Sequence, residues 1–191
     1  MKKIFVINGR AGSGKDTFVN FCSWYAKVEN YSSVQPIKEI AASVGWDRAK
    51  KSEKDRKFLS DLKQLLARYN DFPFEAIKRK IQDFSDSNKE ILFIHIREPE
   101  EIARVKELQE EVGIPIVTLF LDNPRTELIT SNESDANVAN YTYDVTIRND
   151  GTKDDLERKA ENFITKQLVI VPSGFAKDGV FIVPSRPVLA E

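Results

Sequence analysis

A glycine-rich turn between a short apolar run and a helical pattern constrains this sequence more than any other feature. The apolar run covers residues 4–7, and the segment after it reads Gly-Arg-Ala-Gly-Ser-Gly-Lys-Asp-Thr from Gly9 to Thr17. Glycines let such a turn fold tightly with its N–H groups facing inward. A helix N-terminus adds roughly half a positive charge at the same place. The sequence therefore predicts a buried strand, an anion-binding turn and a helix in succession.

The turn has the residue types of a loop that binds a nucleotide triphosphate. The residues expected to contact the nucleotide are Gly9, Arg10, Ala11, Gly12, Ser13, Gly14, Lys15, Asp16 and Thr17. Lys15 reaches the β- and γ-phosphates as a mobile cation. We expect Asp16 and Thr17 to hold a metal ion, although an acid in a first helical turn is favourable without any ligand. The alternative for the whole motif is a turn that merely joins a strand to a helix.

Short apolar runs alternate with helical patterns along the rest of the chain. Strands are predicted over residues 4–7, 33–35, 90–96, 116–121 and 143–147. Helices are predicted over residues 15–28, 37–44, 54–69, 74–84 and 99–112, and from residue 152 onward. This alternation is typical of an α/β fold with a parallel sheet covered on both faces.

The length of 191 residues favours one domain with a small appendage. We place the main domain at residues 1–167 and a β appendage at 168–191, where two apolar runs flank Asp178-Gly179. Such a pair favours a tight hairpin turn. The hairpin either covers a sheet edge or pairs with a second subunit, so a homodimer stays open.

Composition excludes several classes of protein. With 29 Lys and Arg against 30 Asp and Glu, the net charge is -1, which argues against a nucleic-acid partner. The chain has one cysteine, Cys22, and one histidine, His95. These counts exclude a disulfide scaffold and a Cys/His zinc site. The apolar run after Met1 stops after four residues, and no stretch approaches the roughly 20 apolar residues of a membrane span. We therefore expect a cytoplasmic protein without membrane partners.

The Gly-Ser-Gly-Lys-Asp-Thr form resembles P-loop kinases of the nucleoside-monophosphate-kinase type, in which the hydroxyl also sits two places after the lysine. The likeness is closest to phage-type deoxynucleoside-monophosphate kinases and looser to P-loop phosphomevalonate kinases. It spans most of residues 3–165, and segments 94–101 and 143–152 support it. The resemblance implies a three-layer P-loop NTPase with a five-stranded parallel sheet. It also implies acceptor-binding helices at about 46–87, a lid at about 123–141, and ATP and Mg²⁺ as cofactors.

The same resemblance assigns catalytic roles to Lys15, Arg97 and Arg125. Arg97 would hold the anion of the acceptor or the phosphoryl group during transfer. Arg125 would be the lid arginine that contacts the phosphates. An ion pair of Arg97 with Glu100 or Glu101, and a solvated Arg125, are the alternatives.

His95 departs from the family pattern, because the related kinases commonly have aspartate there. A neutral imidazole does not replace a negative charge. Either Asp16 or Asp122 organises the metal instead, or the acceptor chemistry differs, or activity is weak. A buried histidine satisfied by its neighbours is the other interpretation.

The acceptor is expected at a basic segment, since residues 47–80 hold 11 Lys and Arg against 6 Asp and Glu. The predicted acceptor-binding residues are Arg56, Lys63, His95 and Arg97. A solvated helix face is the alternative for Arg56 and Lys63. No dedicated base is evident, and a phosphomonoester needs none because its oxygen is already an anionic nucleophile.

These observations predict an ATP-dependent phosphotransferase that acts on a small monophosphate, most readily a nucleoside or deoxynucleoside monophosphate. A non-catalytic ATP-binding regulator and a kinase of a non-nucleotide phosphate ester are the alternatives.

Overall fold

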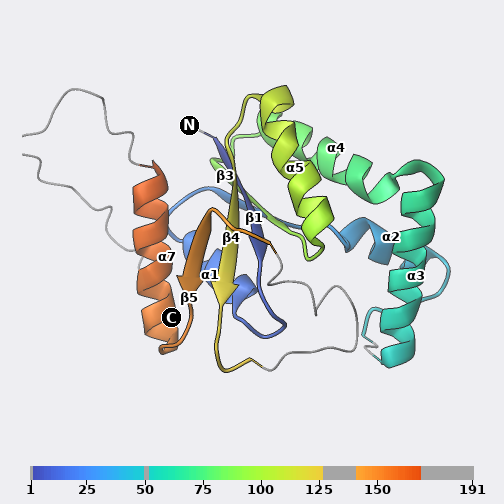
Figure 1. The fold of residues 1–191 in the computed structure, drawn as a ribbon, viewed down its shortest axis with the longest axis horizontal. Helices are drawn as coiled ribbons and strands as arrows, with labels where there is room; N and C mark the ends of the chain where they lie inside the picture. Colours follow the sequence, from blue (N-terminus) through green and yellow to red (C-terminus); the bar gives the residue numbers. More distant parts are fainter. Residues whose placement is uncertain (1, 50–51, 127–140, 169–191) are drawn as a thin grey trace, which may run out of the picture.

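The computed structural model describes residues 2–49, 52–126 and 141–168 (Figure 1). Five strands form one sheet, namely β1 (Lys3–Asn8), β2 (Val28–Ser32), β3 (Ile91–His95), β4 (Ile116–Asp122) and β5 (Val145–Arg148). All neighbouring strands pair in parallel, in the order β2-β3-β1-β4-β5. The predicted five-stranded parallel sheet is confirmed. Because β1 is central, its carboxyl end lies between those of β3 and β4.

Helices cover both faces of the sheet and make three layers (Figure 1). The helices are α1 (Lys15–Cys22), α2 (Gln35–Ser43), α3 (Glu53–Asn70), α4 (Phe72–Asp86), α5 (Pro99–Val112) and α7 (Lys153–Leu168). Side chains of α1 and α7, such as Phe18 and Phe163, pack on one face around Phe5 and Phe93. Side chains of α4 and α5 form a second core on the opposite face.

Two predicted boundaries in the first third of the chain are wrong. The helix predicted over 15–28 ends at Cys22, and the strand predicted over 33–35 lies earlier, at Val28–Ser32. Backbone bonds from Trp24 N–H to Phe21 O and from Tyr25 N–H to Cys22 O tighten the helix end. The strand β2 lies at the sheet edge and carries polar residues, so it lacks the apolar run that marks a buried strand.

The apolar stripe predicted on the long helix exists but is largely uncovered. The helix α3 closely matches the predicted range of 54–69, yet none of its residues is buried. Leu65 is 56% exposed and Tyr69 is 82% exposed. These side chains are exposed because α3 packs mainly against α2 and α4 and lies beyond the edge of the sheet (Figure 1).

Two predicted features fall largely outside the described residues. These are the lid at 123–141, of which only residues 123–126 and 141 are described, and the β appendage at 168–191, of which only Leu168 is described. Within the described ranges, no helix has the length and apolar character needed to cross a bilayer.

Candidate active site

The glycine loop, residues 9–14, leaves the carboxyl end of β1 and leads into α1. Gly9 has a φ of +153°, and a Cβ there would lie 2.5 Å from the Leu121 carbonyl oxygen. Gly14 has a φ of +95°, and its Cβ would lie 2.7 Å from the Asn149 Nδ2. Both positions therefore require glycine, for backbone conformation and for space. The predicted strand–loop–helix arrangement is present.

The Lys15 side chain folds back over the glycine loop. Its Nζ donates hydrogen bonds to the carbonyl oxygens of Gly9, at 2.6 Å, and Arg10, at 3.0 Å. The ammonium thus lies against the loop that leads into α1, and the dipole of a helix is positive at its N-terminus. Both groups bring positive charge to the carboxyl edge of the sheet.

The turn between β5 and α7 contacts the glycine loop through Asn149. Asn149 Nδ2 donates to the Ser13 carbonyl oxygen at 2.8 Å, and the Asn149 backbone N–H donates to the Asp122 carbonyl oxygen at 2.6 Å. A capping box at Thr152 and Asp155 starts α7 directly afterwards. This asparagine was not among the predicted site residues.

His95 ends β3 beside the first turn of α1, with a side chain 15% exposed. Its Nε2 lies 2.8 Å from the Asn30 Oδ1, so Nε2 carries the ring hydrogen. Its Nδ1 lies 3.9 Å from the Asp16 Oδ1. Burial lowers the pKa of His95 to about 4; the Asp16 carboxylate opposes this shift, and the Lys15 and Arg97 cations add to it. The imidazole is therefore neutral at physiological pH, and Asp16 supplies the negative charge next to it.

The predicted acceptor residue Lys63 is held by two carboxylates. Its Nζ lies 2.9 Å from both the Glu98 Oε2 and the Glu101 Oε2, at the start of α5. Although burial opposes it, the two carboxylates hold the pKa of Lys63 above its ordinary value. Glu98 and Glu101 thus hold the Lys63 ammonium at the start of α5. Arg97 itself is exposed just beyond β3.

Arg56 shares the polar side of α3 with Lys63. The two residues are seven positions apart, which corresponds to about two turns of an α-helix, so both side chains leave the helix in a similar direction. Because Lys63 reaches the residues that follow Arg97, this side of α3 faces the exit of β3. Arg56 is exposed there.

Among the described residues, no hydrogen bond or ion pair joins Arg125 to the glycine loop. Its guanidinium donates to the carbonyl oxygens of Asp150 and Gly151, the latter at 3.2 Å. The side chain therefore braces the β5–α7 turn in this structure.

The described residues contain no cluster of three or more His, Cys, Asp or Glu side chains that could cage a metal ion. Asp16 is 94% exposed at its side chain, and Thr17 is half-buried. This arrangement suits an ion that takes most of its ligands from phosphates and water, as Mg²⁺ commonly does.

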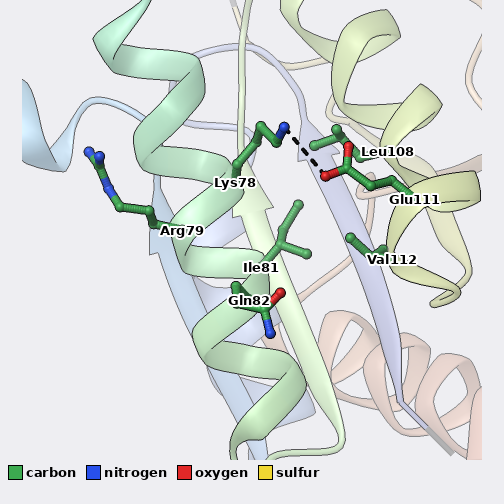
Figure 2. A pocket seen from close by; sticks show the side chains of 7 residues that line it. All are labelled: Lys78, Arg79, Ile81, Gln82, Leu108, Glu111 and Val112. Carbon is green, nitrogen blue, oxygen red and sulfur yellow. Dashed lines mark ion pairs between the residues drawn. The ribbon is translucent and has the colours of Figure 1, made fainter.

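Figure 2 shows a groove of about 220 Å³ between α4 and α5, crossed by an ion pair from Lys78 to Glu111 at 3.4 Å. It lies along the end of α5 that precedes β4. The amino ends of the strands meet there, on the opposite edge from the glycine loop. The groove is therefore separate from the candidate site.

Comparison with known proteins gives a fold and no family. The sequence matches no protein-family model and no curated protein. Solved structures do match. The tunicamycin resistance protein of Deinococcus radiodurans is 12% identical, with 88% of this chain and 96% of that chain covered and a TM-score of 0.53. A protein from Chloroflexus aurantiacus, whose assignment as a kinase is itself provisional, is 9% identical, with coverage of 86% and 97% and a TM-score of 0.50. A shikimate kinase from Aquifex aeolicus is 15% identical, with coverage of 86% and 97% and a TM-score of 0.45.

The chain has the P-loop NTPase fold. In that fold the P-loop is the glycine loop described above, and the fold brings Lys15, Asp16 and His95 together at one edge of the sheet. It also brings Lys63 to Glu98 and Glu101. Arg125 instead points to the turn between β5 and α7.

Three asparagines at the P-loop site escaped prediction, namely Asn8, Asn30 and Asn149. Asn8 carried a usable signal, because it is a polar residue that ends an apolar strand directly before a P-loop. Asn30 carried none, because its contact with His95 depends on strand pairing.

Proposed function

We propose that this protein is an ATP-dependent phosphotransferase that moves the γ-phosphoryl group to a small monophosphate, most readily a nucleoside or deoxynucleoside monophosphate. The observation that carries the proposal is the Lys15 ammonium folded over the P-loop at the start of α1. A second feature supports it. The Nε of Arg10 is buried and has no hydrogen-bond partner within the described part of the chain, and a phosphate oxygen at the loop would supply one.

Phosphoryl transfer depends mainly on positioning and charge neutralisation. The P-loop amides, the α1 dipole and Lys15 hold the polyphosphate. Arg97, at the exit of the neighbouring strand, holds the acceptor anion in line with it. Correct juxtaposition of the two reactants supplies about 7–11 kcal/mol of the barrier reduction.

The residues that would hold magnesium are Asp16 and Thr17. The ion would neutralise charge on the β- and γ-phosphate oxygens. Asp16 adds the negative charge that the neutral His95 does not provide at this edge.

The acceptor site is proposed between α3 and the exit of β3. Arg56 and Arg97 are the side chains proposed to bind the acceptor anion here, whereas Lys63 is held by its two glutamates. His95, at the end of β3, lies between the acceptor and the donor. A phosphomonoester fits because it is anionic and needs no base.

The test is an assay of ADP formation from ATP and Mg²⁺ with a panel of nucleoside monophosphates and other phosphate esters. ADP that appears only when a nucleotide is added supports the proposal. Turnover with a non-nucleotide ester alone would reassign the acceptor. Tight ATP binding by calorimetry, without acceptor-dependent ADP, would indicate a regulator instead.

A further inference from the structure

Asn8 is the last residue of β1, and its side chain is fully buried at 0% exposure. The four residues before it are apolar and also fully buried. A buried amide costs free energy unless both of its ends are hydrogen-bonded. The partners of Asn8 therefore explain why an asparagine can occupy this place.

Both ends of the Asn8 amide are used. Its Oδ1 accepts a hydrogen bond from the Gly9 backbone N–H at 2.8 Å. Its Nδ2 donates to the Arg97 carbonyl oxygen at 3.1 Å and to the Tyr143 hydroxyl oxygen at 2.8 Å. A backbone N–H can only donate and a carbonyl can only accept, so these partners allow one orientation of the amide.

The third partner is itself fixed in place. The Tyr143 ring stacks on Phe120 at a centroid distance of 4.9 Å and packs edge-on against Tyr141 at 5.0 Å. Burial raises the pKa of Tyr143 to about 12, and the hydrogen bond from Asn8 opposes this shift. The hydroxyl is therefore neutral at physiological pH and does not place a charge beside the amide.

The three partners belong to the two halves of the proposed reaction centre. Gly9 opens the P-loop, which holds the phosphate donor, and Arg97 stands where the acceptor anion is proposed. Because β1 lies between β3 and β4, Asn8 is at the point where these segments leave the sheet. One planar amide thus connects the donor loop with the backbone of the acceptor arginine.

We propose that Asn8 is a positioning residue that fixes the P-loop and Arg97 relative to each other, with Tyr143 as its support. This inference rests on the proposed phosphotransfer. Misplacing reacting groups by about 1 Å can cost two orders of magnitude in rate, so a side chain that touches neither substrate can still control kcat.

Three variants separate the contacts. Asn8→Leu keeps the branching at Cγ and the number of side-chain heavy atoms and removes every hydrogen bond of the side chain. Asn8→Asp keeps an acceptor for the Gly9 N–H but turns an oxygen toward the Arg97 carbonyl. Tyr143→Phe removes only the supporting hydroxyl. The matched control is Thr118→Val, since Thr118 is also a buried polar residue, on β4, and bonds Asp144 next to Tyr143.

The measurements are the Kd for ATP with Mg²⁺ by calorimetry, kcat with the best acceptor, and the urea midpoint. Asn8→Leu is expected to weaken ATP binding at least tenfold and to lower kcat about 100-fold. Asn8→Asp should keep the Kd within threefold and lower kcat at least tenfold, and Tyr143→Phe should lower kcat by a smaller factor. Thr118→Val should lose stability while Kd and kcat stay within twofold.

The separation of kcat from Kd in Asn8→Asp is the decisive result, because a general loss of stability would not produce it. If Asn8→Leu fails to fold, Asn8→Asp alone decides, and unchanged kcat in it overturns the inference. Asn8 variants that behave like Thr118→Val overturn it as well, with the proposed function intact.

Wild-type protein that binds ATP without turnover contradicts the proposed function, and the Kd comparison still decides the role of Asn8 at the P-loop. In that case a tenfold weaker Kd for Asn8→Leu than for Asn8→Asp supports the role, and equal values overturn it. Wild-type protein that binds no nucleotide overturns both.

Discussion

The Nδ1 of His95 lies 3.9 Å from the Oδ1 of Asp16. The imidazole ends a central strand and the carboxylate opens the helix after the P-loop, so the two groups meet where the donor phosphates are proposed. Because the ring hydrogen is on Nε2, toward Asn30, Nδ1 turns a lone pair toward this space. The pair therefore offers a hydrogen-bond acceptor next to a negative charge, at the position where the kinases that the sequence resembles commonly have one aspartate.

The buried state of His95 predicts a stability loss in mild acid. Its pKa is lowered to about 4 by burial, whereas the unfolded chain binds the proton near pH 6.5. Between these values the unfolded state holds more protons, so stability falls as pH falls from about 6.5 through 4. Linkage gives a loss of about 2 kcal/mol between pH 7 and pH 5. The measurement is urea unfolding at both pH values.

His95→Gln serves as the control for this effect. The chain has a single histidine, and carboxylates ordinarily titrate below this window. Burial raises the pKa of Glu101, and a raised carboxyl pKa acts in the opposite direction, because it stabilises the fold as pH falls. The variant should therefore lose most of the pH dependence between pH 7 and pH 5. Equal slopes for the variant and the wild type would show that another group causes the loss.

Replacing Lys15 with alanine is expected to abolish useful turnover and to leave the fold intact. The variant loses the ammonium that neutralises developing charge, and loss of one such group commonly costs about 10²–10³ in kcat. Stability should fall by only about 1 kcal/mol, because the bonded carbonyls lie in a partly exposed loop. Lys57→Ala is the matched control, since Lys57 is an exposed lysine paired within α3. Unchanged kcat in folded Lys15→Ala would remove the basis of the proposed function.

Arg56 and Lys63 share one side of α3 but should respond differently to substitution. Lys63→Met leaves Glu98 and Glu101 close together without their cation, so it should destabilise by about 2 kcal/mol, less than for a fully buried pair. Arg56→Ala should change stability by less than about 0.5 kcal/mol and raise the KM for the acceptor about tenfold. Urea unfolding and initial rates at varied acceptor concentration measure both. A large rise in acceptor KM for Lys63→Met with unchanged stability would make Lys63 a direct ligand instead.

The sequence specified the sheet where burial made its strands continuous apolar runs. β1, β3 and β4 are buried on both faces and were predicted to within about two residues. β2 was misplaced because an edge strand can carry Glu29, Asn30 and Ser32 without cost. The spacing of apolar residues in α3 correctly predicted a helix. It could not show that no sheet lies against this helix, so the exposure of its apolar side chains was not predicted.

The candidate site also has parts that the sequence predicts and parts that it does not. The P-loop could be predicted because its backbone geometry depends on neighbouring residues in one short segment. The direction of the Arg125 side chain could not be predicted, since it is set by carbonyls 25 and 26 residues further along the chain. The ion pairs of Lys63 with glutamates 35 and 38 residues away could not be predicted either. The same holds for the hydrogen bond from Asn8 to the Arg97 carbonyl oxygen. Side-chain direction at long range follows from packing, which spacing alone does not encode.

Gly14 and Asn149 should be energetically coupled through the P-loop. A methyl group at Gly14 would lie 2.7 Å from the Asn149 Nδ2, and the φ of +95° is unfavourable for alanine. Gly14→Ala therefore combines a clash with backbone strain of about 1–3 kcal/mol. We expect it to weaken ATP binding more than tenfold, and Asn149→Ala to weaken it several-fold through loss of the bond to Ser13.

The double variant tests this arrangement, because Asn149→Ala makes room for the added methyl group while the strain remains. Its loss in ATP affinity, measured by calorimetry, should be smaller than the sum of the single losses. Gly113→Ala supplies the control for strain alone, since Gly113 has a φ of +63° and a methyl group added there would meet no atom within 4 Å. That variant should lose stability and keep its affinity for ATP. Additive losses in the double variant would mean that Asn149 does not lie against the P-loop in the nucleotide-bound protein.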